Sequence, residues 1–406
     1  MLFNGVIGRK QAMAIVFLIA GMLRLSYLYR SEKTSQIQPD SITHIQMAEN
    51  IISGNGMTDG NYYSIRAPGY PLFLAAVFKL FGKSMLAVQL VQIIISLVSC
   101  WFVYKISRFY FSREVSFLAF TLYSVSYGAF SLPGQILTEC LYVFFLLSAF
   151  YFMLKEKYVL TGFLFAIGYF FRQEILIFAL FVVLVEVAVK KRIVHALKLL
   201  LPMMVLISVW GTRNYIIHQK FIIGTTSTFE HLYESNIYIF ERMGWKVLPE
   251  IPNAGKGLGE LELNQLKKER CRVMFSQQPL YRLIIAPFLK LGFFLYPFLP
   301  EYDVTYVWIL PFWILGMARL SREFGKYWQF YGIFIILVAL MAVFHAIPRF
   351  RNIFLPFMVI FASVSLVEEY KKGGYMRTGV VCWFFGNIVV YFFSPLFRTF
   401  VKGILP

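Results

Sequence analysis

The stretch AMAIVFLIAGML, residues 12–23, contains no charged side chain, and Arg24 follows it directly. It lies in a segment, residues 11–30, of the length that a helix needs to cross the hydrocarbon core of a bilayer. Arg9 and Lys10 precede it, as basic residues precede the apolar core of a signal peptide, but no small-x-small cleavage site follows. We therefore expect a first membrane span that is retained in the protein.

The rest of the chain shares this apolar character. Of its 406 residues 59% are hydrophobic and 19% aromatic, and the mean hydropathy is +0.65. A soluble domain does not need so much apolar surface, so the composition indicates an all-α polytopic membrane protein. The formal net charge of +18 suits basic cytoplasmic loops and anionic lipid or phosphate ligands. The expected surroundings are a lipid bilayer, and no nucleic-acid partner is expected.

Apolar segments recur along the chain and predict about eleven transmembrane helices. The second is too long for one straight span, and the fifth and sixth are short enough to form a hairpin with Arg172 and Glu174 at its tip. The segment 280–299 contains Arg282, Lys290 and prolines, which favours a helix lying on the outer surface. The predicted spans are 11–30, 70–104, 115–133, 139–154, 158–171, 175–189, 199–216, 303–318, 327–344, 352–367 and 378–393.

Lysine and arginine mark alternate loops between these spans, which places the N-terminus in the cytoplasm. The first loop, 31–69, and the long segment 217–302 then lie on the extracytoplasmic side, the latter with interfacial helices. We expect residues 1–406 to form a single integral membrane domain. The basic loops are 105–113, 155–157 and 190–198.

Signatures of soluble enzymes are absent from the sequence. Gly82-Lys83-Ser84 lacks the upstream glycine of a phosphate-binding loop, because position 77 is Val. No H-E-x-x-H, G-x-S-x-G or helix-opening G-x-G-x-x-G motif occurs. The four cysteines, at 100, 140, 271 and 382, have no metal-type spacing, and a disulfide framework is not expected.

Charged residues gather at the predicted outer ends of the spans. A charge near the bilayer centre costs about 2.5–3.5 kcal/mol, so such residues are functional candidates. If the helices form a bundle, acids and arginines converge on one outward-facing cavity. The residues are Asp40, Arg66, Glu139, Arg172, Glu174, Arg213, His345, Arg349 and Arg351.

The same acids also have structural interpretations. Asp40 precedes apolar residues at helical spacing, so it is a suitable N-cap of an interfacial helix. Glu139 lies in a first turn, where a carboxylate suits the helix dipole. His44 lies one turn after Asp40, which leaves a D-x-x-x-H metal pair open.

The basic residues have structural interpretations as well. The side chains of several arginines could extend to lipid headgroups. Glu186 lies four residues before Lys190 on one helix face, which favours an ion pair over a proton carrier. The arginines in question are Arg24, Arg66, Arg172 and Arg213.

Five segments together resemble the GT-C membrane glycosyltransferases of the family 39 type, related to protein O-mannosyltransferases and the lipid A aminoarabinose transferase. The most specific is PDSITHIQMAENIISGNG (39–56) with SIRAPGYPLFLAAVFKLFGKS (64–84), whose R-x-P-G-Y-P opens the second helix. His44 stands where that group commonly has tyrosine, and RQE replaces a frequent Arg-Pro. The other segments are LPGQILTECLYVFFL (132–146), GFLFAIGYFFRQEILIFAL (162–180), SVWGTRNYIIHQKFIIGTTS (208–227) and HAIPRFRNIFLPFMVI (345–360).

The resemblance implies a GT-C fold and an inverting glycosyltransferase in a bacterial cytoplasmic membrane. Such an enzyme moves a hexosyl or pentosyl group from a polyprenyl-phosphate donor to a hydroxyl of a lipid, glycan or protein acceptor, outside the cytoplasm. By this analogy Asp40 is the base or orienting acceptor for the hydroxyl, in a catalytic first loop. Glu139 is the second acid, and a divalent metal ion held by these two acids is left open as a cofactor. The implied substrate-binding residues are Arg66, Arg172, Arg349, Arg351, Tyr70 and His44.

Two other functions stay open at this point. A transporter or flippase of lipid-linked sugars would be expected to have inverted repeats, broken helices and buried mid-span charges, and the sequence shows none of these. An O-antigen ligase or polymerase also joins sugars outside the cytoplasm, and typically has an outer loop rich in arginine and histidine. In segment 217–302 acids and bases are mixed. Both therefore rank behind the glycosyltransferase.

Overall fold

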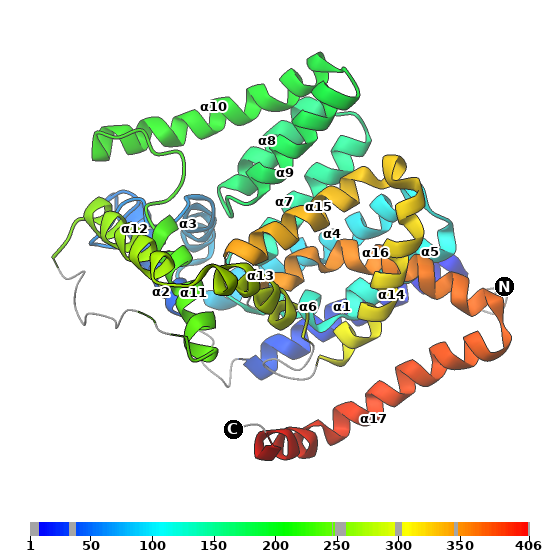
Figure 1. Ribbon diagram of the computed structural model, residues 1–406. Helices are drawn as coiled ribbons and strands as arrows, with labels where there is room; N and C mark the ends of the chain where they lie inside the picture. Colours follow the sequence, from blue (N-terminus) through cyan, green and yellow to red (C-terminus); the bar gives the residue numbers. More distant parts are fainter. Residues whose placement is uncertain are drawn as a thin grey trace.

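The computed structural model describes residues 8–31, 38–245, 247, 257–296, 303–344 and 348–404. Every regular element in these residues is a helix, so the expected all-α fold is confirmed (Figure 1). The predicted loops 31–69 and 217–302, and His345, fall partly or wholly outside the described residues. The helices are α1 Arg9–Ser31, α2 Pro39–Ile52, α3 Gly69–Phe81, α4 Met85–Tyr110, α5 Arg113–Val125, α6 Tyr127–Phe130, η1 Leu132–Gly134, α7 Glu139–Leu154, α8 Tyr158–Tyr169, α9 Ile175–Leu184, η2 Val185–Val189, α10 Ile193–His218, α11 Thr228–Arg242, α12 Glu260–Ser276, α13 Leu280–Leu295, α14 Val304–Leu320, η3 Ser321–Glu323, α15 Phe324–Val343, α16 Pro348–Lys372 and α17 Gly374–Ile404.

Six helical stretches among the described residues are long and apolar enough to cross a membrane. A seventh is added if α5 and the following segment, bent by 63°, count as one broken span. One of the six, Val304–Val343, is 40 residues long because it combines α14, η3 and α15. The predicted count of eleven is not confirmed, because α3, α7, α8 and the α9–η2 stretch are shorter apolar helices of 10–17 residues.

The predicted second span, 70–104, is two helices rather than one. Gly82 ends α3 with a φ of +74°, a conformation that glycine adopts without steric cost. Ser84 then begins the next helix, since its hydroxyl accepts a 3.2 Å hydrogen bond from the backbone N–H of Ala87. The break lets α3 and α4 take different directions, with α3 packed against α2.

The centre of the bundle is α16, and 89% of its most apolar stretch is buried inside the protein. It packs against α5 and α14 (Figure 1). A Cβ on Gly316 would lie 2.4 Å from the carbonyl oxygen of Phe361, so the backbones of α14 and α16 are in direct contact. Gly162 has the same role between α8 and α10, where a Cβ would lie 2.2 Å from the oxygen of Leu199. Small residues at such crossings are typical of membrane bundles.

Several charged residues lie inside the bundle, among them Arg24 and Glu186. Arg24 is 1% exposed and donates to the hydroxyl of Ser96 at 2.9 Å and to the carbonyl oxygen of Ser124 at 3.2 Å. The alternative that Arg24 extends to lipid headgroups is therefore wrong, because its guanidinium joins α1 to α4 and α5. The predicted ion pair of Glu186 and Lys190 is present at 2.7 Å.

Helices α11, α12 and α13 form a layer with its own small apolar core, near α2 and α3 (Figure 1). On α13, Tyr281, Ile284, Ile285 and Phe288 follow helical spacing and are all exposed. Lys290 is on the opposite face and is buried. An exposed apolar stripe suits a helix that lies on a membrane surface, and that interfacial position stays a prediction.

Candidate active site

A cavity of about 330 Å³ lies where α2, α7, α9, α11, α15 and α16 meet. Six of the eight predicted site residues line it, although they come from four separate regions of the sequence. One wall is apolar, with Ile177, Leu340, Met341 and Phe344. We call the charged residues that line the cavity its charged wall. The predicted residues that line the cavity are Asp40, His44, Arg66, Glu139, Arg172 and Arg349.

Asp40 lies in the first turn of α2, beside the proline that begins the helix. The N-cap is Gln38, so the interpretation of Asp40 as the N-cap is wrong. Its Oδ1 accepts a 2.6 Å hydrogen bond from Nη2 of Arg66, and Nη2 of Arg349 lies 3.7 Å from Oδ2. Burial alone would raise the pKa of this carboxyl, but the two arginines outweigh it and hold the pKa below its usual value of 3.8. Asp40 is therefore ionised at neutral pH.

Glu139 is the first residue of α7 and is 1% exposed. Its Oε1 lies 3.0 Å from Nε of Arg349 and 3.2 Å from Nη1 of Arg172. The guanidinium of Arg349 thus lies between the two acids and contacts both. Breaking a buried pair by removing one partner costs about 3–5 kcal/mol, so these contacts also fix α16 against α7.

Arg172 lies at the tip of the hairpin between α8 and α9, as the sequence predicts. Nη2 of Arg172 donates to Oε1 of Glu174 at 2.8 Å, and Cζ of Arg172 lies 4.4 Å from the ring centre of Phe350. Nε of Arg172 is buried and has no hydrogen-bond partner, and the same is true of Nε of Arg66. The cavity therefore contains guanidinium groups with donors to spare for an anionic ligand.

Steric contact explains why position 69, in the R-x-P-G-Y-P motif, is a glycine. The N–H of Gly69 donates a 2.8 Å hydrogen bond to the carbonyl oxygen of Phe170. A Cβ at this position would lie 2.6 Å from that oxygen. The motif therefore brings the start of α3 against the hairpin tip that carries Arg172.

Known proteins resemble this chain in part of its sequence and in its fold. Residues 65–211 match the family model described as dolichyl-phosphate-mannose-protein mannosyltransferase. The oligosaccharyltransferase of Archaeoglobus fulgidus, tethered with an acceptor peptide containing the NVT sequon, aligns with a TM-score of 0.56 at 13% identity, over 90% of this chain and 50% of that chain. The same enzyme in complex with Zn and sulfate gives 0.55 at 13% identity, over 93% and 51%. The fold of this chain is therefore similar to that of the archaeal enzyme.

The family match over residues 65–211 agrees with the resemblance that the sequence motifs carry. The chain spans about half the length of the archaeal oligosaccharyltransferase that it matches. ArnT from Cupriavidus metallidurans bound to undecaprenyl phosphate aligns at 11% identity with a TM-score of 0.42, over 89% of this chain and 78% of that chain. No curated protein matches the chain.

His44 and Tyr70 lie together beside Asp40. The His44 ring meets the Tyr70 ring edge to face, with centres 5.1 Å apart. Burial and the charge of Arg66 lower the pKa of His44 to about 3, so its ring is neutral. Its Nδ1 is buried without a hydrogen-bond partner. Tyr70 does not line the cavity, because its hydroxyl donates to Gln92 at 2.9 Å inside the bundle.

Arg351 does not line the cavity. Residues two apart on a helix point in nearly opposite directions, so Arg349 and Arg351 cannot face the same site. The guanidinium of Arg351 lies 3.4 Å from the ring centre of Tyr306 and donates to the carbonyl oxygens of Phe294 and Tyr296 at 3.3 and 3.4 Å. It holds α16 against α13 and α14.

Two residues that the sequence did not single out also contact the charged wall. His231 on α11 lines the cavity, and its Nε2 lies 3.4 Å from Nη1 of Arg66. Gln38 accepts a 2.5 Å hydrogen bond from Nη1 of Arg349. Neither lies in a motif, and their roles come from tertiary contacts with arginines far away in the sequence.

The two acids do not form a metal site. No group of three or more His, Cys, Asp or Glu in the described part of the chain is arranged to hold a metal ion. Both carboxylates are instead paired with guanidinium groups, and Arg349 fills the space between them. A divalent ion there would have to displace a positively charged side chain from both acids. The residues present therefore do not fit the metal that the resemblance leaves open.

Proposed function

We propose that the protein is an inverting glycosyltransferase, which moves a sugar from a polyprenyl-phosphate donor to a hydroxyl of a lipid, glycan or protein acceptor. The observation that carries this proposal is the charged wall of the cavity, where Asp40 and Glu139 share Arg349 and are each bound by a further arginine. The match of residues 65–211 to a family that uses dolichyl-phosphate-mannose supports a lipid-phosphate donor.

The arginines are the expected ligands of the donor phosphate. Arginine binds phosphate through two parallel N–H groups, and Nε of both Arg66 and Arg172 is buried without a partner. As the phosphate binds, the guanidinium groups shift contacts from the carboxylates toward it. Their positive charge then offsets the charge that develops on the leaving phosphate.

Asp40 is the expected partner of the acceptor hydroxyl. The acceptor oxygen forms a bond to the anomeric carbon while the bond from that carbon to the phosphate oxygen breaks, and the polyprenyl phosphate leaves with the electron pair. The hydroxyl proton passes to Asp40 as the new bond forms. A carboxylate with a lowered pKa is a weak base, so Asp40 orients the hydroxyl first and takes its proton late.

The apolar wall suits the lipid part of the donor. Ile177 on α9 lines the cavity and is 46% exposed, so the wall continues toward the outside of the bundle. An isoprenoid chain along this wall would place its phosphate beside Arg172 and Arg349. Asp40 lies next to Arg349, whose Nη2 is 3.7 Å from Oδ2 of Asp40, so an acceptor held by Asp40 would be beside that phosphate.

We further propose that the cavity faces away from the cytoplasm of a bacterial cell, with the N-terminus inside. Asn61 lies in the exposed loop between α2 and α3. An Asn61→Cys variant in a Cys382→Ser background, which removes the exposed cysteine of the chain, should react in intact cells with a maleimide that cannot cross the membrane, whereas Cys382→Ser alone should not. Labelling only after permeabilisation would show that the loop, and with it the cavity, faces the cytoplasm.

The activity is tested with purified protein in detergent and a set of radiolabelled undecaprenyl-phosphate sugars. The expected result is transfer to envelope lipid or glycan with an inverted anomeric centre, and loss of transfer in Asp40→Asn. Glu49→Gln, on the same helix but outside the cavity, is the matched control. Transport of the labelled lipid in proteoliposomes without sugar transfer would favour a flippase instead. Transfer from a polyprenyl-diphosphate glycan alone would favour a ligase or polymerase.

A further inference from the structure

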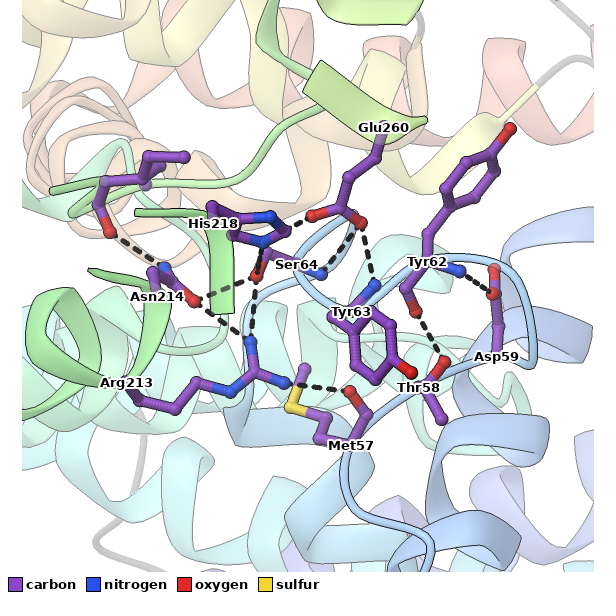
Figure 2. Close-up of polar contacts among 12 residues, drawn as sticks. Met57, Thr58, Asp59, Tyr62, Tyr63, Ser64, Arg213, Asn214, His218 and Glu260 are labelled. Carbon is purple, nitrogen blue, oxygen red and sulfur yellow. Dashed lines mark hydrogen bonds and ion pairs between the residues drawn. The ribbon is translucent and has the colours of Figure 1, made fainter. Parts of the chain in front are cut away.

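A second polar cluster lies outside the cavity, where three segments far apart in the sequence meet (Figure 2). One segment is the loop between α2 and α3, the second is the C-terminal end of α10, and the third is the start of α12. Of the side chains in this cluster, only Arg213 was singled out from the sequence, as a charge at the end of a predicted span. We name the cluster the loop clamp, and its members are Ser64, Arg213, Asn214, His218 and Glu260.

Ser64 is the central member of the loop clamp and is 0% exposed. Its hydroxyl donates to Oδ1 of Asn214 at 2.8 Å and accepts from Nη1 of Arg213 at 2.8 Å. The other terminal nitrogen of Arg213 donates to the carbonyl oxygen of Met57 at 2.9 Å (Figure 2). The end of α10 therefore holds the loop at two points that are seven residues apart.

Glu260 holds the same loop from the other side. Its Oε2 accepts the backbone N–H groups of Tyr63 at 2.7 Å and Ser64 at 3.1 Å (Figure 2). Its Oε1 lies 2.6 Å from Nε2 of His218. Hydrogen bonds to a carboxylate are roughly twice as strong as those between neutral groups, so Glu260 makes the strongest set of contacts in the loop clamp.

The loop clamp does not have the geometry of a nucleophilic serine. In a serine–histidine–acid site the serine and the acid bind opposite nitrogens of the imidazole ring. Here Oγ of Ser64, at 2.9 Å, and the carboxylate of Glu260 both face Nε2 of His218. Ser64 is also buried and already bonded to two other side chains. The cluster is therefore built to hold the backbone.

The held backbone leads directly to the charged wall of the cavity. The carbonyl oxygen of Ser64 accepts from the N–H of Thr226 at 3.0 Å, and that of Ile65 accepts from the hydroxyl of Ser227 at 2.9 Å. The next residue is Arg66, whose guanidinium binds Asp40 at 2.6 Å. Each residue from 63 to 65 thus has a backbone group that is hydrogen-bonded to another segment of the chain.

We propose that the loop clamp positions Arg66 against Asp40, with Glu260 as its principal positioning residue. This inference rests on the proposed function, in which Arg66 pairs with the proton acceptor and binds the donor phosphate. Without Glu260, two amide groups of the loop and Nε2 of His218 lose their shared acceptor. The loop then relaxes, and Arg66 moves with it. A displacement of about 1 Å at a catalytic group lowers a rate on the order of 100-fold.

The first test is hydrogen–deuterium exchange of the detergent-purified protein. Glu260→Ala should raise the exchange rate of the peptide that contains residues 57–66, and Glu260→Gln should raise it less, because an amide oxygen still accepts from the loop. Glu269→Gln, an exposed acid on the same helix, is the matched control and should leave exchange unchanged. Equal exchange in all four proteins would overturn the proposal.

The second test asks whether Glu260 acts through Arg66, which it does not contact. Binding of undecaprenyl phosphate is measured for the wild type, Glu260→Ala, Arg66→Ala and the double variant. If the loop clamp serves Arg66, each single variant weakens binding about tenfold, and the double variant is no weaker than Arg66→Ala. Additive losses would show that Glu260 has only a general structural role.

The two tests separate this inference from the proposed function. Sugar transfer by Glu260→Gln should fall mainly through kcat, and Glu260→Asp should restore part of it, whereas a folding defect would lower the melting temperature of every variant alike. If the wild type neither transfers sugar nor binds undecaprenyl phosphate, the proposed function is wrong. Faster exchange in Glu260→Ala would still support the loop clamp in that case.

Discussion

Nη2 of Arg66 donates a 2.6 Å hydrogen bond to Oδ1 of Asp40 and joins the helix before the R-x-P-G-Y-P motif to the motif itself. The two residues are 26 positions apart, with a loop of exposed and turn residues between them. This contact, together with Arg349, keeps Asp40 ionised beside a cavity whose other walls are partly apolar.

The pH dependence of transfer should report this contact. Burial raises the pKa of Asp40, but Arg66 and Arg349 bring it below 3.8, so the rate should hold at pH 5 and fall only below about pH 4. Arg66→Leu should move this acid limb to higher pH. Since the folded-state pKa is lowered, the pairing also stabilises the fold above the unfolded pKa, and this stability is lost as pH falls through the folded pKa.

The measurement is kcat/KM against pH for the wild type and Arg66→Leu. Arg272→Leu, an exposed residue on α12, serves as the control and should keep the wild-type profile. An acid limb at the same pH in all three proteins would contradict the assignment of Asp40 as the titrating group.

Chelation should leave the enzyme active, because the guanidinium of Arg349 already contacts both acids. Purified protein dialysed against EDTA should transfer sugar at the undialysed rate. Arg349→Met removes the shared cation from both acids and should abolish transfer. Activity that EDTA removes and a divalent ion restores would show that a metal displaces Arg349 in the working complex.

Gly69→Ala should destabilise the protein by about 1–3 kcal/mol, because the new Cβ would lie 2.6 Å from the oxygen of Phe170. Gly292→Ala is the matched control, since a Cβ there meets nothing within 4 Å. Melting temperatures in detergent compare the two variants. A Gly69→Ala protein as stable as the control would mean that the hairpin tip can move away from α3.

Arg351 and Arg349 should respond differently to substitution, although they are close in sequence. Arg351→Met removes hydrogen bonds to Phe294 and Tyr296 and should lower the melting temperature, while kcat per folded molecule stays within about twofold of the wild type. Thermal melting and single-turnover rates separate the two effects. A large loss of kcat at unchanged stability would place Arg351 in the reaction after all.

The sequence predicted the all-α membrane class and most of the charged wall, because apolar segments and a proline–glycine motif are local features. Helix counting was less successful for a physical reason. Helices α7, α8 and α9 are apolar but short, and a helix that is largely buried in protein, as α7 is, need not have the length that a bilayer requires.

The side of a helix on which a residue lies was harder to predict than the helix itself. Arg349 and Arg351 both suit a phosphate ligand by residue type, and their separation depends on the rotation of α16 about its axis. His231 and Glu260 lie in long polar stretches without a motif. Their partners are 165 residues away for His231 and 196 or 197 residues away for Glu260, and only the folded chain brings them together.

The burial of α16 has a consequence for how the protein is made. This helix starts at residue 348, so the ribosome synthesises the α5 and α14 helices around it first. Until α16 is synthesised, Glu139 has no Arg349 with which to pair. The most buried helix is therefore added to helices that have already been made, and the cavity gains its shared arginine after its other lining segments have been synthesised.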